Sequence, residues 1–135
     1  MLSGDQVSLA RQLDLVFKEL NGELLGLHSG VVFVQIRNNV IGKFGIRHHP
    51  LAFRGESPVQ QKGGLSVVHI ASFRRMALES LSHKRNWTHG EIGYEFAVRQ
   101  GAVVVDATFE SNYNMANVMI RYQKKPYYSE SAGNE

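Results

Sequence analysis

Basic residues gather in the middle third of the chain, and they are the residues whose type and spacing could most clearly do chemistry. Residues 37–85 hold nine of the fifteen lysines and arginines but only two acids, Glu56 and Glu79, and the net charge of the whole chain is +3. Four of the six histidines lie in the same segment. Cations concentrated in this way face phosphate or carboxylate groups more often than apolar groups. We therefore expect an anionic partner, either an acidic protein surface or a nucleic acid.

The best candidate site is a run of basic side chains at the end of a predicted strand and in the loop 49–64 that follows it. A loop of this length could wrap an anion, and two arginines on the next predicted helix could extend the same surface. The alternative is a solvated basic loop that binds nothing. The candidate anion-binding or partner-binding residues are Arg47, His48, His49, Arg54, Lys62, Arg74 and Arg75.

Aromatic residues interleave with these cations, as single-stranded nucleic acid binding requires. Bases stack on rings while cations follow the backbone. Phe44 and Phe73 fall on predicted core faces, so Phe53 and Trp87 are the candidate stacking residues. The sequence patterns of the common RNA-binding modules are missing. RNA or single-stranded DNA binding is therefore the alternative function.

Catalytic and metal-binding signatures are missing from the sequence. There is no phosphate-binding glycine loop, no nucleophile elbow, no zinc-type histidine spacing and no cysteine. We expect no cofactor, no metal and no enzymatic activity. The second alternative is an enzyme that acts on a phosphorylated or carboxylated small molecule, with His48, His49 or His89 as the base.

Two segments show helical periodicity. Ser3 and Gln6 have the Ser-x-x-Gln spacing of a capping box, and the helix predicted over 4–21 then repeats apolar residues at helical spacing and ends at an Asn-Gly pair. Residues 66–84 repeat the pattern, although 65–70 could instead form a short strand. Lys84 and Arg85 end this second helix, where cations complement the negative end of the helix dipole.

Strand-like alternation follows each predicted helix. An Asn-Asn pair separates the first two strands and a Gln-Gly pair the next two, so each pair predicts a hairpin. A fifth strand is expected at 118–122, with a helix over 115–120 as the alternative. The four strands of the hairpins are predicted at 31–37, 40–48, 91–99 and 102–111.

This element order predicts an α+β fold: a two-layer sandwich of about five antiparallel strands and two helices, in the order α-β-β-α-β-β-β. We expect one domain over 1–125 and a flexible tail over 126–135. The order resembles that of profilin-like scaffolds such as roadblock and longin domains, and this resemblance implies a dimeric adaptor. Separately, the first strand is apolar on both faces, and Leu24 to Leu27 add further apolar surface, which together predict a homodimer.

Composition places the chain among folded proteins. At 135 residues, with 43% apolar and 20% charged residues, it can bury one core. The N-terminus lacks the features of a secretory signal and no apolar run approaches membrane-spanning length, so a cytoplasmic location without membrane contact is expected. We therefore predict a small non-enzymatic binding or regulatory protein, a homodimeric adaptor that engages an anionic partner through residues 37–85.

Overall fold

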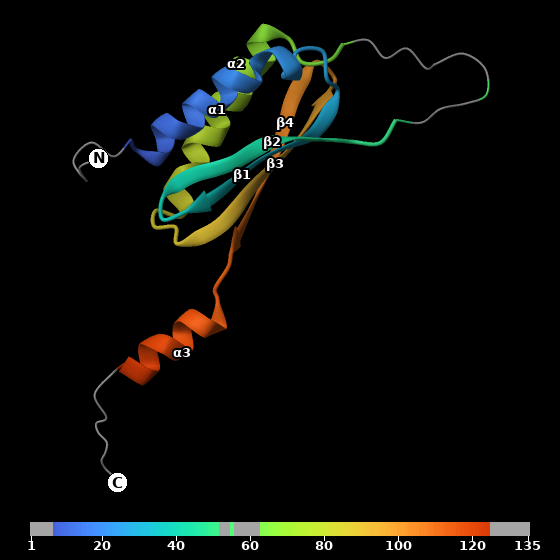
Figure 1. Cartoon of the computed structure of the whole chain (residues 1–135). Helices are drawn as coiled ribbons and strands as arrows, with labels where there is room; N and C mark the ends of the chain where they lie inside the picture. Colours follow the sequence, from blue (N-terminus) through green and yellow to red (C-terminus); the bar gives the residue numbers. More distant parts are fainter. Residues whose placement is uncertain (1–6, 52–54, 56–62, 125–135) are drawn as a thin grey trace.

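The computed structural model describes residues 7–51, 55 and 63–124, which form a four-stranded antiparallel sheet with two helices on one face and a third helix standing apart (Figure 1). The strands lie in the order β2-β1-β3-β4, so β2 and β4 are the two edges. The elements are α1 (Leu9–Leu24), β1 (Ser29–Arg37), β2 (Val40–His48), α2 (Val67–Ser80), the short 3-10 helix η2 (Leu81–His83), β3 (His89–Arg99), β4 (Ala102–Ser111) and α3 (Met115–Lys124).

The α+β class and the antiparallel sheet are as predicted, but the described residues form four strands and three helices instead of five strands and two helices. The predicted fifth strand at 118–122 is wrong, because these residues belong to α3. Asn114 immediately precedes this helix, and its side-chain Oδ1 accepts a hydrogen bond from the backbone N–H of Ala116 at 2.8 Å. Apolar residues then recur at helical spacing at Met115, Val118 and Met119.

Both predicted hairpins are present. Asn38 and Asn39 have φ angles of 52° and 62°, and Gln100 and Gly101 have φ angles of 52° and 80°. Two consecutive positive φ values are the geometry that a two-residue hairpin turn requires, because its twist matches that of the flanking strands. The Gln-Gly turn therefore fixes the register of its whole hairpin, whereas the register set by the Asn-Asn turn shifts by one residue at an irregularity between Val34 and Ile36.

The first helix differs from its prediction at both ends. It begins at Leu9, where the Ser8 hydroxyl accepts from the backbone N–H of Arg11 at 3.1 Å; the predicted capping box lies outside the described residues. It continues past the predicted stop to Leu24, which is completely buried. Burial of Leu24 in the core outweighs the weak helix propensity of the Asn-Gly pair.

The second helix starts where it was predicted. The Ser66 hydroxyl accepts from the backbone N–H of His69, and the His69 ring nitrogen accepts from the backbone N–H of Ser66, so the two residues form a reciprocal cap. The α-helix ends at Ser80 and tightens into η2, so it is shorter than the predicted 66–84.

One hydrophobic core lies between the helices and the sheet. Phe17 of α1 and Phe73 of α2 meet edge to face, with ring centroids 4.9 Å apart, above Tyr94 of β3. The opposite face of the sheet, which we call the open face, is covered by none of the described helices (Figure 1). None of the helices in the described part of the chain is long and apolar enough to cross a membrane. The predicted tail, 126–135, lies outside the described residues.

Candidate partner-binding trough

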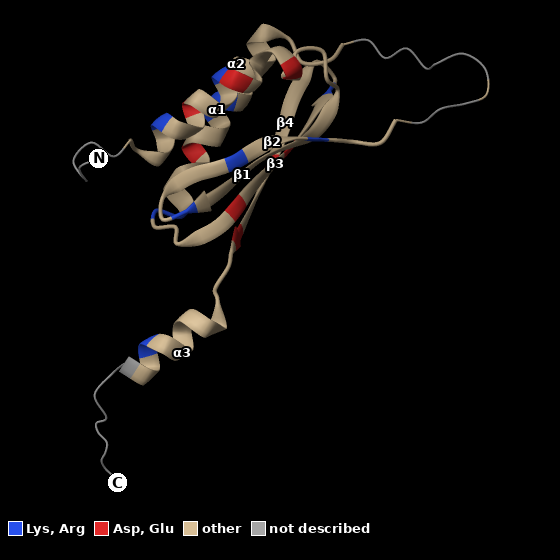
Figure 2. Cartoon of the chain, viewed as in Figure 1, with Lys and Arg blue, Asp and Glu red and all other residues tan. Residues whose placement is uncertain are grey.

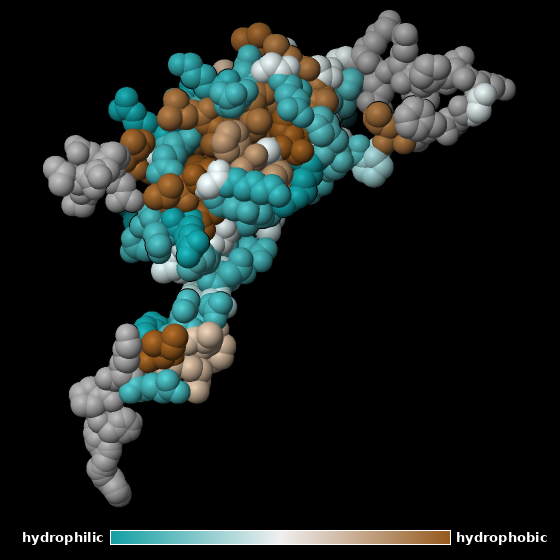
Figure 3. Space-filling view, in the orientation of Figure 1, coloured by the Kyte–Doolittle hydropathy of each residue, from teal (hydrophilic) through white to brown (hydrophobic). Residues whose placement is uncertain are grey.

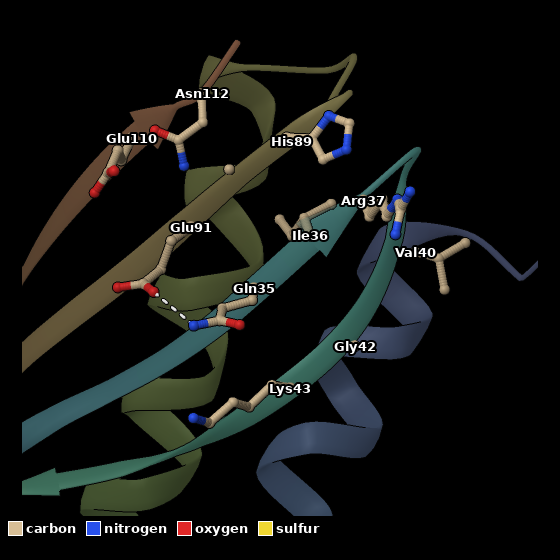
Figure 4. Close-up of a pocket in the computed structure, with 11 residues that line it drawn as sticks. Gln35, Ile36, Arg37, Val40, Gly42, Lys43, His89, Glu91, Glu110 and Asn112 are labelled. Carbon is tan, nitrogen blue, oxygen red and sulfur yellow. Dashed lines mark hydrogen bonds between the residues drawn. The ribbon is translucent and has the colours of Figure 1, made fainter. Parts of the chain in front are cut away.

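A hollow of about 650 Å³ crosses one end of the open face, and we call it the trough (Figure 4). It lies at the end of the sheet where β1 reaches the Asn-Asn turn and β3 begins. Gly42 leaves part of its wall without a side chain, and Gly90 contributes backbone only. The polar residues that line it are Gln35, Arg37, Lys43, His89, Glu91, Glu110 and Asn112.

The packing beneath Gly90 sets the shape of the trough. A Cβ atom at this position would lie 2.4 Å from the Trp87 ring and 2.2 Å from the carbonyl oxygen of Glu110, so only glycine fits there. The backbone N–H of Asn112 donates to the carbonyl oxygen of His89 at 2.9 Å, which ties the end of β4 to the start of β3. The trough is therefore a feature of the rigid sheet and does not depend on a loop.

The two sides of the trough carry opposite charges (Figures 2 and 4). Glu91 of β3 and Glu110 of β4 are direct cross-strand partners, so two carboxylates face each other on one side. Glu91 accepts hydrogen bonds from Gln35 at 3.3 Å and Arg47 at 3.2 Å. Within the described residues, no cation pairs with Glu110. Like charges directly opposite one another on paired strands are destabilising. A cation supplied by a partner would therefore be favoured beside Glu110.

The basic side of the trough consists of Arg37 at the end of β1 and Lys43 in β2. Both side chains are exposed, and no acid in the described part of the chain forms an ion pair with either. Cations that are near a concave surface and lack an internal carboxylate are suited to receiving an external anion.

The basic side chains predicted at the end of β2 form ion pairs or hydrogen bonds within the protein. Arg47 pairs with Glu91, and its guanidinium lies 4.0 Å from the centre of the Phe33 ring. His48 Nε2 lies 2.8 Å from a carboxylate oxygen of Glu23. His49 contacts the hydroxyl of Ser29 at 2.9 Å and lies 3.6 Å from Glu95. These three side chains therefore have partners already.

The structure does not bring the predicted cations onto one surface. Arg74 and Arg75 lie on α2, in the helical layer, whereas Arg47 lies on the open face of the sheet. Arg74 pairs with Asp14 of α1. The expectation that α2 would extend the basic surface of β2 is therefore wrong, because the sheet separates the two sets. Arg54 and Lys62 lie outside the described residues.

The predicted stacking role of Trp87 is also wrong. Its side chain is 1% exposed, and its ring centroid lies 6.0 Å from that of Phe109. Its indole N–H donates to the carbonyl oxygen of Lys84 at 3.2 Å. A ring buried in this way offers no face to a base. The other candidate, Phe53, lies outside the described residues.

The three histidines considered as catalytic bases do not share a site. His48 pairs with Gly30 at one end of β1, and His89 pairs with Arg37 at the other end. Seven residues of extended strand separate these ends by about 23 Å. Among the residues that the structure describes, no three histidine, aspartate or glutamate side chains are arranged to hold a metal ion.

Sequence reasoning counted Arg37 and Lys43 in the basic segment but did not select them as site residues. A signal was present, since Arg37 precedes the predicted Asn-Asn turn and Lys43 lies on the charged face of the second predicted strand. What the sequence could not supply is the pairing of β1 with β3, which brings Glu91 beside Gln35.

Comparisons of the chain with protein-family models, with curated proteins and with solved structures find no match.

Proposed function

We propose that this chain is a small non-enzymatic binding protein, a homodimeric adaptor, that receives an acidic segment of a protein partner in the trough. The observation that carries the proposal is that Arg37 and Lys43 line the trough without an ion pair to any described acid. An external carboxylate placed there would gain charge-assisted hydrogen bonds without breaking an internal pair.

The opposite charges of the trough favour a peptide over a nucleic acid. A nucleic acid presents phosphates at regular spacing along its length, and Glu91 and Glu110 on the acidic side would repel them. A peptide can present a carboxylate to Arg37 and Lys43 and a basic side chain to Glu110. The burial of Trp87 also removes one of the two stacking rings that a single strand would use.

A pair of probes tests this proposal: a fluorescent peptide that alternates glutamate and lysine residues, and a single-stranded oligothymidine of similar length. We expect the full chain to bind the peptide, and Arg37→Ala combined with Lys43→Ala to weaken that binding on the order of tenfold. Arg75→Ala, which removes an exposed cation from the helical layer, is the matched control and should leave binding unchanged.

Two results would overturn the proposal. Equal loss of peptide binding in the Arg75→Ala control would show that net charge, and not the trough, attracts the peptide. Binding to the oligonucleotide alone, with an affinity that falls steeply as salt is added, would favour the nucleic-acid alternative.

A further inference from the structure

A serine, a histidine and a glutamate meet on the open face, at the end of the sheet opposite the trough. Ser29 begins β1, His49 directly follows β2, and Glu95 lies in β3. One ring nitrogen of His49, Nδ1, lies 2.9 Å from the Ser29 hydroxyl, and the other, Nε2, lies 3.6 Å from a carboxylate oxygen of Glu95. The imidazole therefore bridges a hydroxyl and a carboxylate, and we call these three residues the Ser29 cluster.

Strand pairing brings the Ser29 cluster together from distant parts of the chain. The register that pairs Gly30 with His48 places His49 across from Ser29, although the two are 20 residues apart in the sequence. Glu95 pairs with the β1 residue two positions after Ser29. Because positions two apart on a strand share a face, the Glu95 side chain lies on the same side of the sheet as Ser29. The rigid sheet thus positions all three groups.

The contacts of His49 favour one arrangement of its ring protons. A carboxylate attracts the N–H of an imidazole, so Glu95 favours a proton on Nε2. Nδ1 then carries the lone pair and accepts a hydrogen bond from the Ser29 hydroxyl. A hydroxyl is activated as a nucleophile by an adjacent base that a third group orients. The Ser29 cluster has this order of groups, with Nδ1 in place of the more usual Nε2 as the base.

A hollow of about 250 Å³, which we call the Ser29 hollow, opens beside Ser29 on the open face. Ala97 of β3 is the direct partner of Ser29, and Val104 of β4 is the direct partner of Ala97, so the three side chains form one row across the sheet. The small side chain of Ala97 leaves the middle of this row low, and a small molecule placed there would lie next to Ser29. The other residues that line the hollow are His49, Glu95, Phe96, Arg99 and Asp106.

The lining of the Ser29 hollow suits a short uncharged acyl chain. Large apolar side chains reach the surface over the helical layer and on α3 (Figure 3). Val104 of β4 is also 46% exposed, and it lines the same hollow as Ser29. An acyl chain that packed against Val104 would bury apolar surface. Glu95 and Asp106 bring two carboxylates to the hollow and Arg99 brings one cation, so the balance of charge disfavours an anionic acyl group.

We infer that Ser29 is an activated nucleophile that accepts a short uncharged acyl group from a thioester. Ser29 Oγ attacks the carbonyl carbon while its proton passes to His49 Nδ1. The carbon–sulfur bond then breaks, and the sulfur leaves with the electron pair and takes up that proton. The products are an ester at Ser29 and a free thiol. Because the protein keeps the acyl group, this is a modification without turnover, and it goes beyond the binding function of the trough.

A fluorescent fluorophosphonate tests the nucleophile in the full chain, because this class of probe reacts with activated serine hydroxyls and releases fluoride. We expect one dye per chain, and mass spectrometry of the digested protein should place it on Ser29. Ser29→Ala should abolish labelling, and His49→Ala should slow it on the order of 100-fold, because the base is lost. His48→Ala removes the neighbouring imidazole, which contacts Glu23 instead, and is the matched control that should label at the unmodified rate.

Competition between acyl donors tests the chemistry of the ligand. Incubation with a propionyl thioester should block later labelling of Ser29 by the probe. A succinyl thioester with the same leaving group adds a carboxylate, and it should block labelling several-fold more slowly. Failure of the propionyl donor to block labelling would contradict acyl transfer, and faster blocking by the succinyl donor would contradict an uncharged ligand.

Glu95 acts through His49 and is therefore a positioning residue. Glu95→Gln should lower the maximal labelling rate on the order of tenfold, a modest loss because the Glu95 side chain is 62% exposed. It should leave the half-saturating probe concentration unchanged, since the probe does not depend on Glu95 for binding. Asp106→Asn removes the same charge from the same hollow and is the matched control. An equal loss of rate in Asp106→Asn would show that net charge, and not the orientation of His49, sets the rate.

Three results would overturn the inference: no labelling of the unmodified chain, labelling that persists in Ser29→Ala, or equal labelling rates in the unmodified chain and His49→Ala. Far-ultraviolet circular dichroism should show that each variant is folded, and His49→Gln replaces His49→Ala if that variant unfolds. Failure of the trough is distinguishable, since Arg37→Ala combined with Lys43→Ala should lose peptide binding and still label at Ser29. Conversely, Ser29→Ala should still bind the peptide.

Discussion

Replacing Tyr94 by phenylalanine should change the way that stability depends on pH. Tyr94 is completely buried, and its hydroxyl donates to the carbonyl oxygen of Ala77 at 3.2 Å and lies 2.8 Å from the hydroxyl of Ser80. Burial raises the pKa of Tyr94 from 10.0 to about 12, although the hydrogen bond with Ser80 partly opposes this rise. The folded protein therefore holds the neutral phenol above the pH at which an unfolded chain loses that proton.

The sign and size of the effect follow from this difference. Because the pKa is raised in the folded state, the stabilisation is fully present below pH 10 and is lost as pH rises from 10 to 12. Two pKa units correspond to roughly 3 kcal/mol of unfolding free energy. Tyr94→Phe removes this loss, but it also removes the hydroxyl hydrogen bonds, at a cost of about 1 kcal/mol near neutral pH.

Urea unfolding of both proteins at several pH values measures these differences. Near pH 8 we expect the unmodified chain to be more stable than Tyr94→Phe by about 1 kcal/mol. Above pH 10 the difference should shrink and then change sign, because only the unmodified chain must keep a phenol protonated. Lysines and other tyrosines titrate in both proteins and cancel from the difference. Parallel stability curves from pH 8 to 12 would refute the reasoning.

Two further substitutions test the sheet around the trough. Gly90→Ala should lower the free energy of unfolding by roughly 3 kcal/mol or more, measured by chemical denaturation, because its Cβ would overlap the Trp87 ring and the carbonyl oxygen of Glu110. Glu110→Gln should raise the free energy of unfolding by about 0.2 to 1 kcal/mol at low salt, because it removes the charge opposite Glu91. High salt should abolish that gain, and an equal gain in the control Glu79→Gln would contradict the cross-strand explanation.

Local chemistry explains which parts of the fold were predictable. The Asn-Asn and Gln-Gly turns specify their hairpins through two adjacent residues, and the Ser66 cap specifies the start of α2 within one turn. Residues 115–122 could not be assigned in the same way, since Val118, Ile120 and Tyr122 satisfy a strand pattern while Met115, Val118 and Met119 satisfy a helix pattern.

The candidate site was less predictable because its contacts are distant in the sequence. Arg47 and Glu91 are 44 residues apart, and Arg74 and Asp14 are 60 residues apart, so no local pattern reveals that these charges neutralise one another. The burial of Trp87 likewise depends on a distant pairing, because Gly90 of β3 and the paired strand β4 cover its ring. Charge density in the sequence identified the basic segment, but only the strand order determines which cations lack an internal acid and can bind a partner.

The charges on the outermost strands also discourage two copies from joining into one continuous sheet. If β4 paired antiparallel with β4 of another copy about Thr108, Asp106 of each copy would lie opposite Glu110 of the other. A β2-to-β2 junction centred near Lys43 would bring this cation, which has no ion pair to a described acid, toward its own copy in the same way. Each edge strand of the sheet thus disfavours pairing with the same strand of a second copy.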